Sequence, residues 1–242
     1  MTKLRWLLPG VLLLLGAVAH AQGHAHAAVS AGKLDKTKLS YAIGYQIGSQ
    51  FADGKPDVDI PTLQRAIEDA YAKRHPAVTM QDMQQQLERL KAQMHADALA
   101  EFKRIARDNA RRSEAFMARN RRQPGVVQLP SGIQYQVLQR GAGSVSPTVT
   151  STVTVNYRGM LVDGTEFDNT WARGSPVSFA VNSVLSGWQD VIPRMHVGDR
   201  WKVVIPSRLA YGEAGALPRI GPNEALVFDI QLLDIKAGAG RP

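Results

Sequence analysis

No cysteine occurs among the 242 residues of the sequence. Disulfide bonds, thiol nucleophiles and thiolate metal ligands are therefore excluded, and so is a lipid anchor attached through a cysteine. A protein of this composition has to be stabilised by its hydrophobic core alone.

The motifs of several large enzyme classes are also absent. The sequence has no phosphate-binding P-loop, no G-x-G-x-x-G after a predicted strand and no G-x-S-x-G elbow. His75, His95 and His196 lie in different predicted elements, so they indicate no metal cluster. A conventional hydrolase or cofactor enzyme finds no support, and neither a cofactor nor a metal is expected.

Only one long apolar run is present, and it lies at the N-terminus. Lys3 and Arg5 precede the run over residues 6–18, and Ala19-His20-Ala21 follows as a cleavage signal. A membrane anchor is the alternative, but the run is short and interrupted by proline and glycine. We expect a signal peptide over 1–21, a flexible leader over 22–34, and export to the periplasm or outer membrane without a lipid anchor.

The formal net charge of +8 is concentrated in one place. Residues 102–124 contain 8 basic and 2 acidic side chains. A solvated helix face is the simpler interpretation, and peripheral contact of residues 103–122 with an anionic membrane surface is the alternative. An exported protein has little access to nucleic acid, so no nucleic-acid partner is expected.

The first half of the mature chain has helical periodicity. Helices are predicted over 35–52, from the capping residue Asp59 onwards, and over 80–121, where no proline or glycine interrupts residues 77–123. The last helix would be about 60 Å long. A heptad-like seam runs along it: Met80, Met83, Leu87, Leu90 and Met94. We expect helices 35–78 to form a homodimer and 79–123 to be a long connecting helix, with packing inside one chain as the alternative.

After Pro124-Gly125 the apolar period changes to two. Alternating segments lie around residues 133–137, 153–157, 177–181, 201–205 and 226–232, with a hairpin signal at Asp163-Gly164. One short helix is expected over 183–190. The predicted fold class is α+β: an all-helical N-terminal domain with one very long helix, joined to a C-terminal domain over 124–242 in which an antiparallel β-sheet wraps on a short helix.

Several separated motifs in this second half occur in a recognisable order. They are the run from Val155 to Asp168, then Val184-Leu185-Ser186-Gly187-Trp188, Leu209-Ala210-Tyr211-Gly212 and Ala225-Leu226-Val227-Phe228-Asp229. This part resembles the FKBP-type peptidyl-prolyl cis/trans isomerases. The first half resembles the helical dimerisation domain of macrophage infectivity potentiator (Mip) proteins, through Leu39 to Gly44, Glu114-Ala115-Phe116 and Pro124 to Gly132.

The resemblance implies a prolyl-binding pocket with Trp188 as its floor. Asp168, Tyr211 and Tyr157 would be the catalytic residues, helped by the backbone N–H of Leu185. The substrate-binding residues implied are Phe167, Arg173, Val177, Val184, Leu185, Trp188, Ile220 and Phe228. Arg173 would pair with Tyr157 or Asp168, and Ile220 would lie in an overhanging loop. Taken singly, large aromatics more often fill cores, and only their joint match indicates a site.

Three positions depart from the family pattern: Val177 replaces an aromatic wall, Ala216 a bulkier or polar loop residue, and Arg219 an apolar one. We expect these changes to alter substrate preference and affinity for macrolides such as rapamycin and tacrolimus, and Arg219 to favour acidic clients. The implied clients are proline-containing exported proteins. Two alternatives stay open: a dimeric holdase chaperone and a surface-binding, virulence-type factor, each with isomerisation as a secondary activity.

Overall fold

The computed structural model describes residues 33–54 and 56–236. The predicted signal peptide and nearly all of the predicted leader lie outside these residues. The chain divides into two compact units, and the division falls between Met94 and His95. The second unit therefore includes the C-terminal half of the helix that the sequence assigns to residues 79–123.

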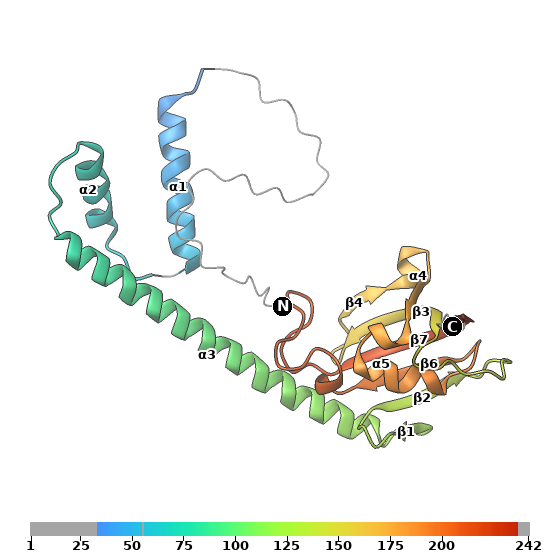
Figure 1. Cartoon of the computed structure of the whole chain (residues 1–242). Coiled ribbons are helices and arrows are strands. Elements are labelled where there is room, and N and C mark those ends of the chain that lie inside the picture. The colour runs from blue at the N-terminus through green and yellow to red at the C-terminus, as the bar shows by residue number, and fades with distance from the viewer. Residues whose placement is uncertain (1–32, 55, 237–242) are drawn as a thin grey trace, which may run out of the picture. The chain divides into compact units, whose positions relative to one another are not determined.

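Three helices make up the N-terminal part of the chain (Figure 1). They are α1 (Lys36–Gly54), α2 (Ile60–Tyr71) and α3 (Met80–Asn120). The three helices predicted from periodicity and capping residues are confirmed. No helical stretch within the described residues combines the length and the apolarity needed to cross a bilayer.

Side chains at the helix starts explain where two of these helices begin. The carboxylate of Asp59 accepts a hydrogen bond of 2.8 Å from the backbone N–H of Thr62 at the start of α2. The hydroxyl of Thr79 accepts one of 3.1 Å from the backbone N–H of Asp82 and donates one of 2.8 Å to its carboxylate. Both arrangements satisfy backbone donors that have no partner inside the helix.

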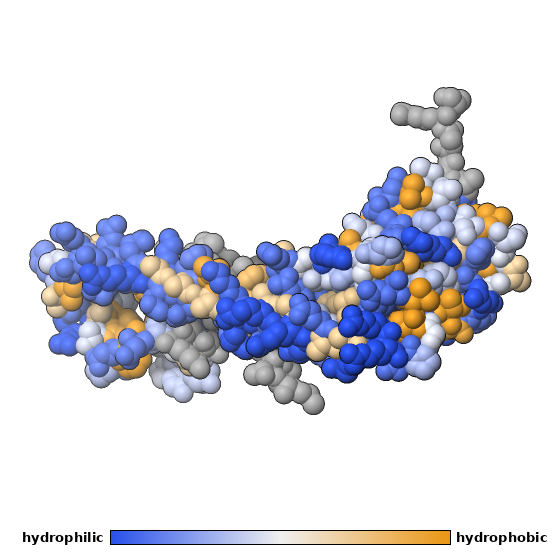
Figure 2. Space-filling view, turned by 90° about the horizontal axis from the view of Figure 1, so that it is seen from below, coloured by the Kyte–Doolittle hydropathy of each residue, from blue (hydrophilic) through white to orange (hydrophobic). Residues whose placement is uncertain are grey.

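The first unit buries none of its described side chains. Every residue of 33–52 and 56–94 is either exposed or only partly buried. Exposed members of the predicted apolar stripes and seam include Leu39, Ile43, Ile67, Tyr71, Met80, Leu87 and Leu90, and hydrophobic residues are visible at the surface in Figure 2. Since apolar burial is the main favourable term in folding, these helices lack a core of their own within the described residues.

The second unit is built on a seven-stranded antiparallel sheet. Its strands are β1 (Val126–Gln128), β2 (Gln134–Gln139), β3 (Thr152–Leu161), β4 (Glu166–Asn169), β5 (Val177–Ala180), β6 (Arg200–Ile205) and β7 (Leu226–Lys236). The order is β1-β2-β6-β7-β3-β4, and β5 also pairs with β3. The predicted α+β class is confirmed.

Short helices lie between the strands. They are α4 (Thr170–Arg173), α5 (Ser186–Val191) and the 3-10 turns Val181–Ser183, Ile192–Arg194 and Ser207–Leu209. The helix expected over 183–190 corresponds to α5, which begins three residues later. The single turn α4 was not predicted, because four residues are too few to show a helical period.

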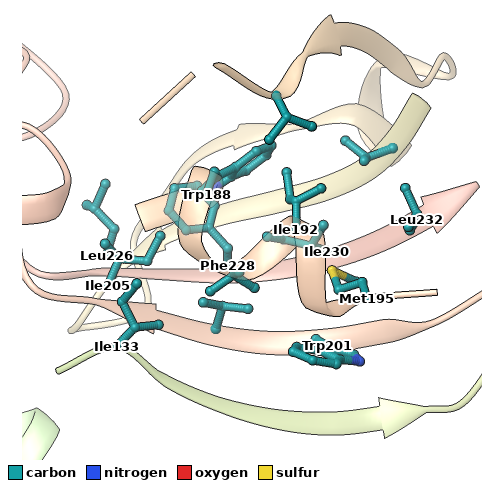
Figure 3. Packing of buried hydrophobic residues seen from close by; sticks show 14 of the residues in the cluster. Ile133, Trp188, Ile192, Met195, Trp201, Ile205, Leu226, Phe228, Ile230 and Leu232 are labelled. Carbon is teal, nitrogen blue, oxygen red and sulfur yellow. The ribbon is translucent and has the colours of Figure 1, made fainter. Parts of the chain in front are cut away.

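One face of the sheet and α5 enclose the hydrophobic core. Trp188 and Ile192 follow each other along α5 and the adjoining turn, and they pack with Phe228 and Ile230 of β7 (Figure 3). The close approach of α5 requires a residue without a side chain, since a Cβ on Gly187 would lie 2.4 Å from Cγ2 of Ile205.

The C-terminal half of α3 covers part of the opposite face. Val204 and Val227 are 1% and 4% exposed, are paired in the sheet, and alternate with core residues. Next to Val204 in the register is Gln134, whose side chain donates to the carbonyl oxygen of Met117 at 3.0 Å and accepts from Asn120 at 2.9 Å. The end of α3 is thus a structural part of the sheet unit.

Candidate active site

The largest aromatic cluster in the second unit surrounds Trp188. Its ring centre lies 5.1 Å from that of Tyr157, 5.2 Å from that of Phe228 and 5.4 Å from that of Phe179. Phe167 extends the cluster through an edge-to-face contact of 5.8 Å with Phe228. Trp188 and Phe228 are buried, whereas the other three rings are only partly buried. Together they form an apolar basin at the edge of the core.

A glycine makes room for the wall of this basin. Gly159 of β3 pairs with Phe228 on one side and with Asp168 on the other. A Cβ at this position would lie 2.5 Å from the ring of Phe167 and 3.1 Å from that of Phe228. Only glycine therefore allows both rings to meet over the strand.

A polar cluster borders the aromatic rings. The hydroxyl of Tyr157 donates to one carboxylate oxygen of Asp168, and the guanidinium group of Arg173 donates to the other. The backbone N–H of Asn169 also donates to Asp168, at 2.9 Å. The guanidinium carbon of Arg173 lies 6.0 Å from the centre of the Tyr157 ring. The carboxylate is thus held by one neutral and one charged side chain.

Helix α4 determines where Arg173 lies. Asn169 caps this turn, because its side-chain oxygen accepts hydrogen bonds from the backbone N–H groups of Trp171 and Ala172. The buried hydroxyl of Thr170 accepts from the backbone N–H of Tyr157 at 2.8 Å, which ties α4 to β3. The short helix therefore turns the chain so that Arg173 lies beside Asp168.

Tyr211 and Ile220 come from the loop between β6 and β7. Ile220 is buried in the core cluster and forms an isolated antiparallel bridge with Ala216. Tyr211 is 40% exposed and makes none of the ring contacts that join the other aromatic site residues. The structure thus brings most of the sequence-derived residues together and leaves the Tyr211 side chain at the periphery.

The remaining sequence-derived residues lie around Trp188. Val184 and Leu185 lead into α5, and Val177 lies on β5; all three are partly buried against the core cluster. Leu185 is the residue before the first turn of α5, so its N–H is outside the hydrogen bonds of that helix. The indole N–H of Trp188 is buried and has no hydrogen-bond partner among the described residues.

Two further residues, which the sequence did not place among the pocket residues, contact the aromatic rings or their backbone. Phe179 lies on the same face of β5 as Val177, and the alternation in that strand was the signal that points to it. Arg219 donates to the carbonyl oxygen of Phe167 at 3.1 Å, a contact between residues far apart in sequence that no local pattern indicates. Beside the basin, Arg219 and Arg173 line an open depression together with residues 165–169, Ala172 and Pro218.

The arrangement is suited to binding an apolar ring with a polar bond at its edge. The aromatic rings provide a low-dielectric surface, and the Asp168 cluster provides fixed polar groups beside it. The described residues contain no group of three or more ligand side chains placed to hold a metal ion.

Comparison with known families matches both halves of the chain. Residues 143–233 match the family model of the FKBP-type peptidyl-prolyl cis-trans isomerase, and residues 36–137 match that of the domain amino terminal to such isomerases. The chain belongs to the FKBP-type peptidyl-prolyl cis-trans isomerase family. Members of this family act on the peptide bond that precedes proline, and the predicted enzyme class is confirmed.

Individual relatives place the chain with the Mip-like members of that family. It is 40% identical over 234 residues to the peptidyl-prolyl cis-trans isomerase Mip of Coxiella burnetii, covering 96% of this chain and 98% of the relative. It is 38% identical to the outer membrane protein MIP of Legionella longbeachae, covering 90% and 94%. The crystal structure of FkpA from Escherichia coli matches with a TM-score of 0.71 at 35% identity, over 86% of this chain and all of the chain in that structure. The predicted resemblance to FKBP-type isomerases with a helical N-terminal domain is confirmed.

Proposed function

We propose that the aromatic basin is the site at which this isomerase turns the X–Pro bond, with the prolyl ring resting on Trp188. The observation that supports this most is the joining of the basin to the Asp168 cluster through Tyr157. The ring of Tyr157 contacts Trp188, and its hydroxyl donates to Asp168. The remaining proposed walls are Phe167, Val177, Val184, Leu185, Ile220 and Phe228.

The proposed mechanism requires no covalent step. Rotation about a peptide bond has a barrier of about 18–20 kcal/mol, because the planar amide is stabilised by resonance. The twisted transition state has lost part of its charge separation, so transfer into a dry aromatic basin favours it over the planar ground state. The N–H of Leu185 and the hydroxyl of Tyr211 would donate to substrate carbonyl oxygens, while Asp168 holds Tyr157 and Arg173 in place.

A peptide assay tests this assignment. We expect the protein to accelerate isomerisation of a short Leu-Pro-Phe peptide, and Asp168→Ala to lower kcat/KM by at least about tenfold, equivalent to roughly 1.4 kcal/mol. Tyr211→Phe should have a smaller effect in the same direction. Asp234→Ala is the matched control, since Asp234 is an exposed carboxylate on β7 of the same unit. Equal activity of the Asp168 and Asp234 variants would exclude the assigned site.

We also propose that the N-terminal helices form a homodimer. The absence of any buried side chain in residues 33–52 and 56–94 supports this, because so many exposed apolar residues need a partner surface. A second copy of the chain offers the same stripes, and the seam over Met80 to Met94 suits a helix–helix interface.

Sedimentation equilibrium tests the dimer. We expect the wild type to sediment at twice the chain mass and Leu87→Glu to shift the equilibrium towards the monomer, since Leu87 is 64% exposed in the single chain. Gln85→Glu, on another face of α3, adds the same charge and should leave the mass unchanged. A monomeric wild type at micromolar concentration would contradict the proposal.

We infer that the clients are proline-containing exported proteins, and that the helical unit adds holdase activity. Exposed apolar surface on the first unit supports the second inference. Suppression of the aggregation of an unfolded client should survive Asp168→Ala, whereas isomerisation should not. Loss of both activities in that variant would favour a single shared site. Rapamycin or tacrolimus is expected to compete with the peptide and not with the aggregating client.

The basic part of α3 supports a third inference, peripheral contact with anionic lipid. Arg104 and Arg111 pair with neighbouring acidic residues. Among the described residues, no carboxylate forms an ion pair with Lys103, Arg107, Arg119, Arg121 or Arg122. Together with the signal-like residues 1–21, this agrees with a location in the periplasm or at the outer membrane. Co-sedimentation with phosphatidylglycerol vesicles should fall steeply with added salt, and salt-independent binding would contradict an electrostatic contact.

A further inference from the structure

Two buried polar residues of α3 bind the loop between β6 and β7. Asn109 is 2% exposed and Ser113 is 6% exposed. The side-chain amide of Asn109 donates to the carbonyl oxygen of Pro222 at 2.8 Å. The hydroxyl of Ser113 donates to the carbonyl oxygen of Asn223 at 3.3 Å and accepts from the backbone N–H of Ala225 at 2.8 Å. Three hydrogen bonds therefore join one helix to one short loop segment.

That segment is bonded in turn to the part of the loop that contains Tyr211. The backbone N–H of Asn223 donates to the carbonyl oxygen of Gly212 at 2.9 Å, and that of Gly215 donates to Tyr211 at 3.2 Å. Asn223 has a φ of +59°, a left-handed conformation that asparagine adopts more readily than most residues. The helix thus fixes a strained residue whose N–H supports the turn beside Tyr211.

The same segment follows Ile220 in the chain, with only Gly221 between them. Two backbone hydrogen bonds, of 2.9 and 3.0 Å, close the turn between Ala216 and Ile220. Gly221 follows at once, and a Cβ there would lie 2.6 Å from the side-chain nitrogen of Asn109. There is no spare room between helix and loop, so a displacement of either one has to move the other.

The contact is completed by a buried charged residue, Glu224. The carboxylate of Glu224 accepts from the backbone N–H of Gly221 at 3.3 Å and lies 3.8 Å from the guanidinium group of Arg112 on α3. The loop is therefore held to α3 at both its backbone and its side chains.

We propose that Asn109 and Ser113 are positioning residues of the isomerase, which hold the loop so that Tyr211 stays at the rim of the prolyl basin and Ile220 stays packed in its wall. The proposal rests on the site assignment above. A loop of this length has many conformations available, and ordering it before the substrate binds removes an entropic cost from each turnover. The functional catalytic unit then includes the second half of α3 as well as the sheet.

The position of α3 is consequently coupled to the site. A continuous chain of hydrogen bonds joins the helix to the site. It runs from Asn109 and Ser113 through the segment at Asn223 to the turn at Tyr211. Anything that shifts α3 against the sheet would alter the loop and, with it, the affinity for substrate.

Hydrogen exchange and steady-state kinetics of the full chain test this role. We expect Asn109→Ala with Ser113→Ala to speed amide exchange at Gly215, Ala216 and Ile220, and to lower kcat/KM by roughly three- to thirtyfold, mainly through a higher KM. Ser113→Thr keeps the hydroxyl, so amide exchange at these loop positions should be slower in this variant than in the double alanine variant. Asn120→Ala is the matched control, because it removes a similar bond from α3 to β2 and leaves the loop bonds intact. This control variant should change neither the amide hydrogen exchange of the loop nor the KM.

The two proposals fail in different ways. If loop exchange and KM of the double variant equal those of the wild type while Asp168→Ala is inactive, the positioning role is overturned and the site assignment stands. If exchange rises in the double variant but Asp168→Ala is fully active, the helix holds the loop but the proposed site is wrong. Should the double variant not fold, Gly221→Ala pushes on Asn109 from the loop side, and an unchanged KM in that variant would overturn the coupling.

Discussion

The buried indole of Trp188 gives a sharp prediction about stability. The side chain is 5% exposed and lies within 5.4 Å, centre to centre, of three aromatic rings. Removing it in Trp188→Ala should cost about 3–5 kcal/mol, through lost burial and the cavity left behind. In a unit of this size the melting temperature should then fall by roughly ten degrees.

Trp188→Phe should behave differently. A phenyl ring keeps the aromatic contacts and removes an N–H that has no partner among the described residues. An unpaired buried donor costs about 1–3 kcal/mol, which offsets most of the lost ring volume. We therefore expect Trp188→Phe to change the free energy of unfolding by less than about 1.5 kcal/mol, while kcat/KM falls because the floor of the basin is smaller.

Trp201→Phe is the matched comparison. Trp201 is also 5% exposed and belongs to the same core, but its indole N–H donates to the buried carboxylate of Asp199 at 3.2 Å. Its replacement leaves a buried acceptor with one bond fewer, so it should destabilise more than Trp188→Phe, by about 1–3 kcal/mol. Urea unfolding followed by circular dichroism measures all three variants. If Trp188→Phe is as damaging as Trp188→Ala, or more damaging than Trp201→Phe, the reasoning is refuted.

Three further predictions concern charged residues. Burial raises the pKa of Glu224 above its ordinary value. The free energy of unfolding of the wild type relative to Glu224→Gln should therefore be greatest below about pH 4 and decline as the pH rises through the folded-state pKa. A difference in unfolding free energy that stays constant between about pH 4 and 8 would contradict this prediction. Arg219→Gln should lower the ratio of kcat/KM for Glu-Pro over Lys-Pro peptides by about two- to fivefold, whereas Arg140→Gln, an equal charge change at an exposed site, should leave the ratio unaltered. Asp229 is 5% exposed and pairs with two arginines, so Asp229→Ala should cost about 2 kcal/mol; a loss no larger than that of Asp234→Ala would disprove the importance of these pairs.

The long elements of the fold were readable from the sequence because their signals are local. Asp59 and Thr79 bond to backbone N–H groups three residues away, so helix starts are visible as short motifs. Strands such as β3 and β7 follow from alternation, which is also local. The three-residue strand β1 and the four-residue helix α4 give too few positions for a period to emerge, whereas the alternation of Val177 and Phe179 still marked the short strand β5.

The contact between α3 and the loop could not be predicted from the sequence, for a different reason. Asn109 and Ser113 interrupt the apolar face of α3, and their hydrogen-bond partners in the loop lie 110 or more residues away in the chain. A polar residue on a helix gives no sign of such a partner, because the sequence pattern records the burial of apolar groups and not the satisfaction of polar ones. The site residues were found by family resemblance; their meeting around Trp188 is a property of the packed sheet.

The central claim, that the prolyl ring binds over Trp188, is tested most directly by the indole N–H signals in a titration of the ¹⁵N-labelled protein with a proline peptide. We predict that the Trp188 signal, assigned by its loss in Trp188→Phe, shifts to saturation, while those of Trp171 and Trp201 stay in place and an alanine-for-proline peptide has no effect. If the peptide is isomerised but the Trp188 signal does not move, the bond is turned elsewhere and the proposed site is wrong.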